Sequence, residues 1–146
     1  MKTLGECCCC LGLAALFLVG SASAAEVKNL DELKDRISTS GPSEQAYYCA
    51  EMVRTLVEVA NKQYSDGNYA GAQASIDEIE RYAELAREAT PKTHKLKQAE
   101  ITLREAARRL EDIGKSLSMV DRPPVAKAVA HLHAVESELL KRLFSR

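Results

Sequence analysis

Aromatic residues are scarce in this sequence, which has no tryptophan, two phenylalanines and five tyrosines among its 146 residues. This composition argues against a recognition surface built from many aromatic side chains. A basic surplus is also missing, because 20 Lys and Arg residues face 21 Asp and Glu residues, a formal net charge of −1. Nucleic-acid-binding domains usually carry such a surplus, so we expect no nucleic-acid partner. The apolar share of 46% is typical of a globular chain and not of a disordered one.

A hydrophobic run long enough to span a membrane is absent too. The longest run, residues 7–19, has 13 residues, whereas a transmembrane helix needs about 20. It follows the weakly basic start Met1-Lys2 and precedes the small residues of segment 20–25. Together these features are typical of a secretory signal peptide. We therefore predict that residues 1–25 are a signal peptide, cleaved after Ala24 or one residue later, and that the protein is periplasmic or secreted.

Four of the five cysteines lie together in this segment, from Cys7 to Cys10. They serve either as small hydrophobes within the signal peptide or as acylation sites that hold an uncleaved chain on a membrane. Apart from this segment we expect no membrane contact. Cleavage leaves Cys49 as the single thiol, so the mature chain cannot form an internal disulfide. Cys49 shares a helical face with Met52 and Leu56, which predicts a buried, unreactive thiol rather than a nucleophile.

Residues 26–146 show helical periodicity from end to end, with apolar residues recurring at spacings of three and four. Asn29 with Glu32 predicts a capping box at the start of the first helix, and Ser43 is the expected N-cap of the second. Gly67 suits a left-handed helix cap. The expected breaks between helices are Ser40-Gly41-Pro42, Asp66-Gly67-Asn68, Thr90-Pro91 and Asp121-Arg122-Pro123-Pro124.

Each expected helix carries an apolar stripe. The helix over residues 43–65 has two stripes, and so wide an apolar face indicates a central helix with more than one neighbour. Its stripes are Cys49, Met52, Leu56 and Val59, and Ala46, Ala50, Val53, Val57, Ala60 and Tyr64. The helix over residues 68–89 carries Tyr69, Ala72, Ile76, Ile79, Ala83 and Ala86. The next carries Leu96, Ala99, Leu103, Ala106, Leu110, Ile113, Leu117 and Val120, and the last Val125, Val129, Leu132, Val135, Leu139 and Leu143.

Short connections between these helices make consecutive helices antiparallel neighbours. On the solvent side of the fourth helix we expect the i,i+4 ion pairs Glu100–Arg104, Glu105–Arg109 and Glu111–Lys115. The sequence therefore predicts a single all-α domain over residues 26–146. This domain is an antiparallel bundle of four long helices, arranged as two helical hairpins with coiled-coil-like seams, and a short N-terminal helix.

The turn between the second and third helices resembles that of a tetratricopeptide repeat. Gly67, Asn68 and Tyr69 match the family's inter-helix turn, Ala72 matches its small residue three positions on, and Ile76 its bulky packing residue. The resemblance covers about 30 residues, and no second copy occurs 34 residues away in either direction. It implies a shared hairpin geometry and, by analogy, a role in protein interaction.

Residues suited to catalysis, cofactor binding or metal binding form no recognisable motif. His131 and His133 are two positions apart on one helix, so they point in different directions, and His94 lies far away in sequence. The sequence lacks the Glu-x-x-His motif of di-iron bundles, a Cys-x-x-Cys-His haem motif and a glycine-rich phosphate loop. The acidic residues Asp77, Glu80, Glu84 and Glu88 read as a solvated helix face. We predict no catalytic, cofactor-binding or metal site and no enzymatic activity.

A few apolar residues lie outside the expected seams. If they converge, they form a docking surface; scattered, they need no explanation. They are Tyr47, Tyr48, Leu85, Ile101 and Phe144. The leading hypothesis is an exported, cofactor-free helical module of the cell envelope that binds another envelope protein or itself. The alternatives are a ligand- or metal-binding bundle and an enzyme of unrecognised type.

Overall fold

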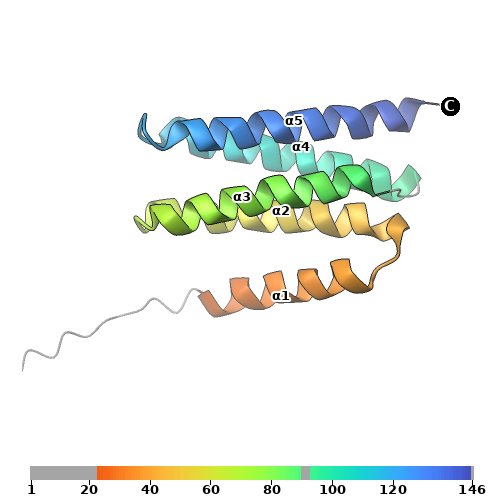
Figure 1. The fold of residues 1–146 in the computed structure, drawn as a ribbon, viewed down its shortest axis with the longest axis horizontal. Coiled ribbons are helices and arrows are strands. Elements are labelled where there is room, and N and C mark those ends of the chain that lie inside the picture. The colour runs from red at the N-terminus through yellow and green to blue at the C-terminus, as the bar shows by residue number, and fades with distance from the viewer. Residues whose placement is uncertain (1–22, 90–92, 146) are drawn as a thin grey trace, which may run out of the picture.

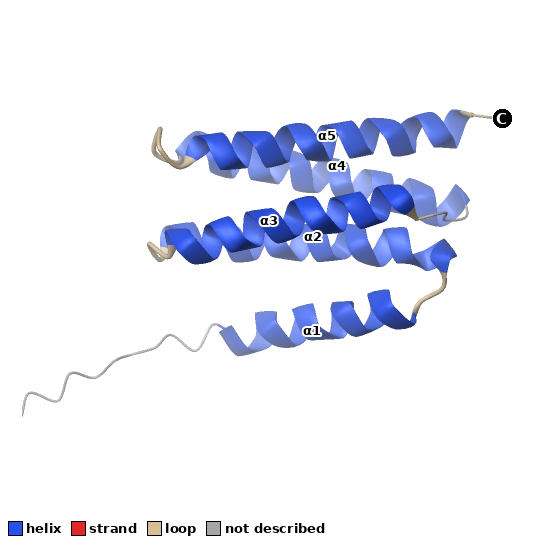
Figure 2. Cartoon of the chain, in the orientation of Figure 1, coloured by secondary structure: helices blue, strands red, loops and turns tan. Residues whose placement is uncertain are grey.

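A computed structural model describes residues 23–89 and 93–145 of the chain, and it folds them into α-helices joined by short turns (Figures 1 and 2). The helices are α1 (Ser23–Thr39), α2 (Pro42–Ser65), α3 (Tyr69–Glu88), α4 (Thr93–Ser116) and α5 (Arg122–Phe144). The predicted all-α class is confirmed. The predicted signal peptide and the Cys7–Cys10 run fall outside the described residues, except that residues 23–25 lie in α1. Within the described ranges, no helix combines the length and hydrophobicity needed to cross a bilayer.

The four long helices form two antiparallel hairpins, α2–α3 and α4–α5, stacked on one another. α2 packs against α4, and α3 packs against α5. Each helix of this four-helix bundle therefore contacts two others of the bundle. α1 packs on the outside of α2, and in Figure 1 it lies at the opposite edge of the molecule from α5. Because α2 contacts α1, α3 and α4, the prediction that it is the central helix is confirmed.

The core follows the predicted seams closely. Both stripes of α2 are buried, apart from Val59, which is half-buried. The largest fully buried side chains outside α2 are Ile76 and Ile79 of α3, Leu103 and Leu110 of α4, and Val125, Leu132, Val135 and Leu139 of α5. Alanines fill much of the remaining core and let the helix backbones approach closely. Tyr69 is the exception in its seam, because it is 55% exposed and leans on Tyr64, with ring centroids 6.2 Å apart.

Two predicted helix starts are wrong. α1 begins at Ser23 and not at Asn29, so Asn29 lies inside the helix and forms no capping box. Segment 23–28 has neither glycine nor proline, and nothing in it opposes an earlier start. α2 begins one residue before Ser43, with Gly41 as its N-cap and Pro42 in its first turn. Proline suits that position because its fixed φ is helical and its missing N–H would have no helical partner.

The α2–α3 turn has the predicted form. Gly67 adopts the left-handed conformation with φ of 75°, which costs glycine little because it has no Cβ. The backbone N–H of Asn68 then donates to the Gln63 carbonyl at 2.8 Å. The Asn68 side chain in turn accepts a hydrogen bond from the Gly71 backbone N–H at 3.0 Å, so Asn68 is the N-cap of α3.

The end of α4 departs from the prediction. The helix stops at Ser116, which leaves Val120 in the following turn and 85% exposed, so its assignment to the apolar seam is wrong. Arg122 donates from its guanidinium to the carbonyls of Leu117 and Lys115, at 2.8 and 3.2 Å. The Ser118 hydroxyl adds a contact to the Asp121 carboxylate at 2.6 Å. These bonds satisfy carbonyl groups at the end of α4 and close the turn into α5.

Ion pairs on α4 are only partly as predicted. Glu100–Arg104 and Glu111–Lys115 form, at 2.9 and 3.3 Å. Glu100 is nevertheless only 3% exposed, so the prediction that it lies on the solvent side of the helix is wrong. Arg109 pairs with Glu58 of α2 at 2.8 Å instead of with Glu105, because the neighbouring helix brings a second carboxylate within reach.

Candidate functional site: the outer face of α4 and α5

The solvent-facing side of α5 has few charged residues for an exposed helix. Ala126, Ala130, Ala134 and Ser137 are exposed along this side. Exposed helix faces of globular proteins normally carry charged and polar residues. The face ends in two exposed apolar side chains, Leu140 at 38% and Phe144 at 80%. Its exposed charged residues are Arg122, Lys127 and Lys141. Lys141 lies on the face itself, beside Ser137, Leu140 and Phe144.

A hollow of about 530 Å³ lies where this face meets the end of α4. Its apolar wall comes from α5, and Gly114 lies on the α4 side. A Cβ at Gly114 would lie 3.1 Å from Cγ1 of Val125, so the glycine allows α4 and α5 to approach closely here. The residues that line the hollow are Glu111, Gly114, Lys115, Arg122, Val125, Ala126, Val129, Ala130 and His133.

A second hollow of about 320 Å³ lies at the other end of the same α4–α5 groove. It joins Ile101 of α4 to Leu140, Leu143 and Phe144 of α5. Two of the residues that lay outside the predicted seams, Ile101 and Phe144, therefore converge. Lys97, Glu100 and Arg104 form its polar rim.

The remaining residues outside the seams lie elsewhere. Tyr47 and Tyr48 stack edge to face, with ring centroids 5.3 Å apart. The Lys95 ammonium lies 4.5 Å from the centre of the Tyr47 ring. Leu85 is half-buried and packs against the core. The five residues thus give one converging pair and not a single surface.

The groove between α4 and α5 carries charge of both signs. The Lys115 ammonium lies 3.3 Å from the Glu111 carboxylate and 3.0 Å from that of Asp112, and its hydrogen bonds to these carboxylates, the one to Asp112 first, raise its pKa. At the opposite end, Lys97 is exposed on the rim of the second hollow. Between them, Nδ1 of His133 lies 3.1 Å from a carboxylate oxygen of Glu136.

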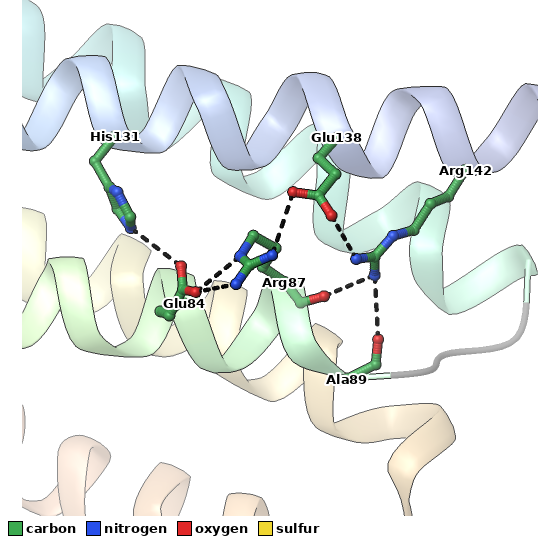
Figure 3. A network of polar contacts seen from close by, with 6 residues as sticks. All are labelled: Glu84, Arg87, Ala89, His131, Glu138 and Arg142. Carbon is green, nitrogen blue, oxygen red and sulfur yellow. Dashed lines mark hydrogen bonds and ion pairs between the residues drawn. The ribbon is translucent and has the colours of Figure 1, made fainter.

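A polar network fastens α3 to α5 on another side of the bundle (Figure 3). Glu84 accepts a hydrogen bond from Nε of Arg87 at 2.8 Å, and Nε2 of His131 lies 3.6 Å from its carboxylate. Glu138 bridges Arg87 and Arg142, at 3.5 and 2.7 Å. The hydrogen bond from Arg87 is the main cause that lowers the pKa of Glu84.

Arg142 also closes the end of α3. Its guanidinium donates to the carbonyls of Arg87 and Ala89, at 2.6 and 3.5 Å, in the last turn and cap of the helix (Figure 3). These carbonyls have no partner within the helix. The prediction of a solvated acidic face on α3 is correct for Asp77 and Glu88, which are exposed. It is wrong for Glu80, which binds Lys127 of α5 at 3.0 Å, and for Glu84.

The other candidate residues take no part in a shared site. Across the described ranges, no group of three or more His, Cys, Asp and Glu residues is placed to hold a metal ion. His94 is exposed at the start of α4. Cys49 is fully buried, and this burial raises the pKa of its thiol to about 12. The predicted burial of Cys49 is confirmed.

The sequence pointed to Ile101 and Phe144 as residues outside the seams. It did not reveal the exposed α5 face that runs from these residues to the first hollow. Ala126, Ala130 and Ala134 recur every four residues without an intervening charge on that side, which was the available signal. Comparison of the chain with protein-family models, with curated proteins and with solved structures finds no match. The proposal for function therefore depends on the geometry of this molecule.

Proposed function

We propose that the protein is an exported, cofactor-free helical module that acts by binding a protein partner, another envelope protein or itself, through the outer face of α4 and α5. The observation that carries this proposal is the exposed α5 face, with small residues along its length and Phe144 at its end. In this proposal the protein has no enzymatic role.

Three properties of this face suit a protein interface. Small side chains permit a partner helix to approach α5 closely. The two hollows offer places for apolar anchor residues of a partner, which usually supply most of the binding energy. Mixed charges on the rim, such as Lys97 and Glu111, provide orientation without a net preference for one sign.

Export is part of the same proposal and is supported by the sequence pattern of residues 1–25. The likeness of the α2–α3 turn to a tetratricopeptide hairpin agrees with an interaction role, by analogy. Intact-mass measurement of the protein made in its own cells tests export. We expect Ala25 or Glu26 as the first residue, and retention of residues 1–10 would contradict export.

Site-specific photocrosslinking in living cells tests the binding face. A photoreactive amino acid at Ala130 or Ser137 should give covalent adducts, because both positions lie on the outer side of α5. The same amino acid at Ala74, exposed on α3, is the matched control and should give none. Absence of adducts at Ala130 and Ser137, or equal yields at all three positions, would refute the binding face.

A further inference from the structure

We propose that the occupant of this face is a second copy of the same chain, packed antiparallel against α5 about a two-fold axis at the level of residue 135. The inference rests on the proposed function because it uses the same surface. It adds the identity of the partner and the register of the contact.

The register follows from the positions of large and small side chains along α5. Phe144 and Ala126 lie equally far from residue 135 on opposite sides, and so do Leu140 and Ala130. In an antiparallel pair centred there, each large apolar side chain of one copy meets a small one of the other. Alternation of large and small residues across facing positions is how helices interdigitate.

The structure has space for these contacts between large and small side chains. Phe144 projects into solvent at one end of α5 and is 80% exposed. The hollow of about 530 Å³ lies at the other end, against Ala126 and Ala130. Phe144 lies about 14 Å from the level of residue 135, and the hollow extends from about 8 Å at Ala130 to about 14 Å at Ala126 on the opposite side, at 1.5 Å per residue. A two-fold axis at that level therefore brings Phe144 of each copy over the hollow of the other copy, twice per dimer.

Charges on α4 fit the same axis. α4 runs antiparallel to α5, with Gly114 against Val125 at one end and Lys97 beside Phe144 at the other. The first contact places residue 104 of α4 level with residue 135 of α5, and the second places residue 106 there, so the axis passes close to residue 105. Lys97 and Glu111 lie eight and six residues from 105 on opposite sides, and both line the groove. In the dimer, Lys97 of each copy faces Glu111 of the other, which gives two pairs of opposite charge.

Like charges near the axis are already partnered within each copy. Arg104 lies at the level of the axis and is held by the buried Glu100 at 2.9 Å. Lys127, on the far edge of the face, is bound to Glu80 at 3.0 Å. Lys141 lies on the face six residues from the axis. The Lys141 side chains of the two copies are therefore about 18 Å apart along the helices, at 1.5 Å per residue, which is beyond the screening length at physiological salt.

Sedimentation velocity on the purified protein, as the cell processes it, is the first test. We expect a concentration-dependent dimer, and Ala130→Arg should make the protein monomeric because the arginine occupies the place where Leu140 of the other copy packs. Ala74→Arg places the same substitution on exposed α3 and should leave the dimer intact. Phe144→Ala, at an exposed helix end, should weaken the dimer by about tenfold or more, since a buried aromatic anchor typically contributes that much.

A charge-exchange experiment tests the two-fold register. Lys97→Glu alone and Glu111→Lys alone each create two like-charged pairs in a homodimer, and each should weaken it by about tenfold. An equimolar mixture of the two variants restores opposite charges at both ends and should form a dimer as tight as the unmodified protein. Such rescue on mixing would not occur for a contact on another face.

The outcomes separate this inference from the proposed function. A strictly monomeric protein overturns self-association, and so does a dimer that survives both Ala130→Arg and Phe144→Ala. If circular dichroism shows that Ala130→Arg does not fold, Phe144→Ala and the mixing experiment show whether the dimer forms through the α5 face. A monomer whose photocrosslinker at Ala130 captures a different protein in cells overturns this inference and leaves the proposed function standing. A monomer without any adduct overturns both.

Discussion

Truncating Leu110 to alanine tests whether the α4 seam forms the core of the bundle. Leu110 is fully buried in α4, and the substitution removes three carbon groups from the interior. At about 0.8 kcal/mol per buried CH₂, the transfer term alone is roughly 2.4 kcal/mol. A residual cavity adds to this, so we expect the free energy of unfolding to fall by about 3–4 kcal/mol, within the range for buried leucines.

Urea denaturation followed by helical circular dichroism measures this change, with the m-value expected to stay constant. Val120→Ala is the matched control on the same predicted stripe. Because Val120 is 85% exposed, its truncation should change the free energy of unfolding by less than about 0.5 kcal/mol. A loss below about 1 kcal/mol for Leu110→Ala, or equal losses for both variants, would refute the packing described for α4.

Three further predictions concern the interior, the turns and the pH response. Cys49 should resist thiol-labelling reagents in the native protein and react fully after unfolding, because burial raises its pKa to about 12; rapid native labelling would contradict the position of α2. Asn68→Ala should lower the free energy of unfolding by about 1 kcal/mol through loss of the α3 cap, whereas the exposed Ser65→Ala should cost less. The hydrogen bond from Arg87 lowers the pKa of Glu84, so its stabilisation is complete above the unfolded carboxyl pKa and is lost as the pH falls through the folded value. Glu84→Gln should therefore reduce the loss of stability between about pH 5 and pH 3, and an unchanged acid profile would contradict the network.

The helical seams were predictable because burial follows a period that the sequence itself displays. Leu103, Leu110, Leu132 and Leu139 lie where the spacing places them, and each is fully buried. Local chemistry also sufficed for the α2–α3 turn, since Gly67 is the residue that takes a left-handed conformation at little cost. Such features depend on residues that are neighbours in sequence.

Features that depend on contacts between helices were not predictable. Val120 continues the α4 period, yet the side chain of Arg122 binds the carbonyls at the helix end and the chain turns before Val120. Glu100 reads as a solvent-facing partner of Arg104, and its burial follows from how the helices pack. In each case a tertiary contact overrides the local signal.

The candidate site also combines features that the sequence predicts with features that depend on contacts between helices. Ile101 and Phe144 stood out in the sequence as apolar residues outside the seams. That they line one hollow depends on the register of α4 against α5, which is fixed where Gly114 meets Val125. The exposed small residues of α5 became informative only once the structure showed which side of that helix its neighbours leave uncovered.

Distances between spin labels on the two copies test the central claim, self-association through α5, most directly. Labels on an unnatural amino acid at position 137 should lie about 6 Å apart along the helix axis, and labels at position 126 about 27 Å apart, at 1.5 Å per residue. The two α5 axes themselves are about 8–10 Å apart. We therefore expect strong broadening of the electron paramagnetic resonance lines for the label at position 137. For the label at position 126 we expect a single, longer distance in a pulsed measurement. Absence of any distance between copies in a labelled protein that still sediments as a dimer, or the same distance at both positions, would contradict an antiparallel α5 pair centred on residue 135.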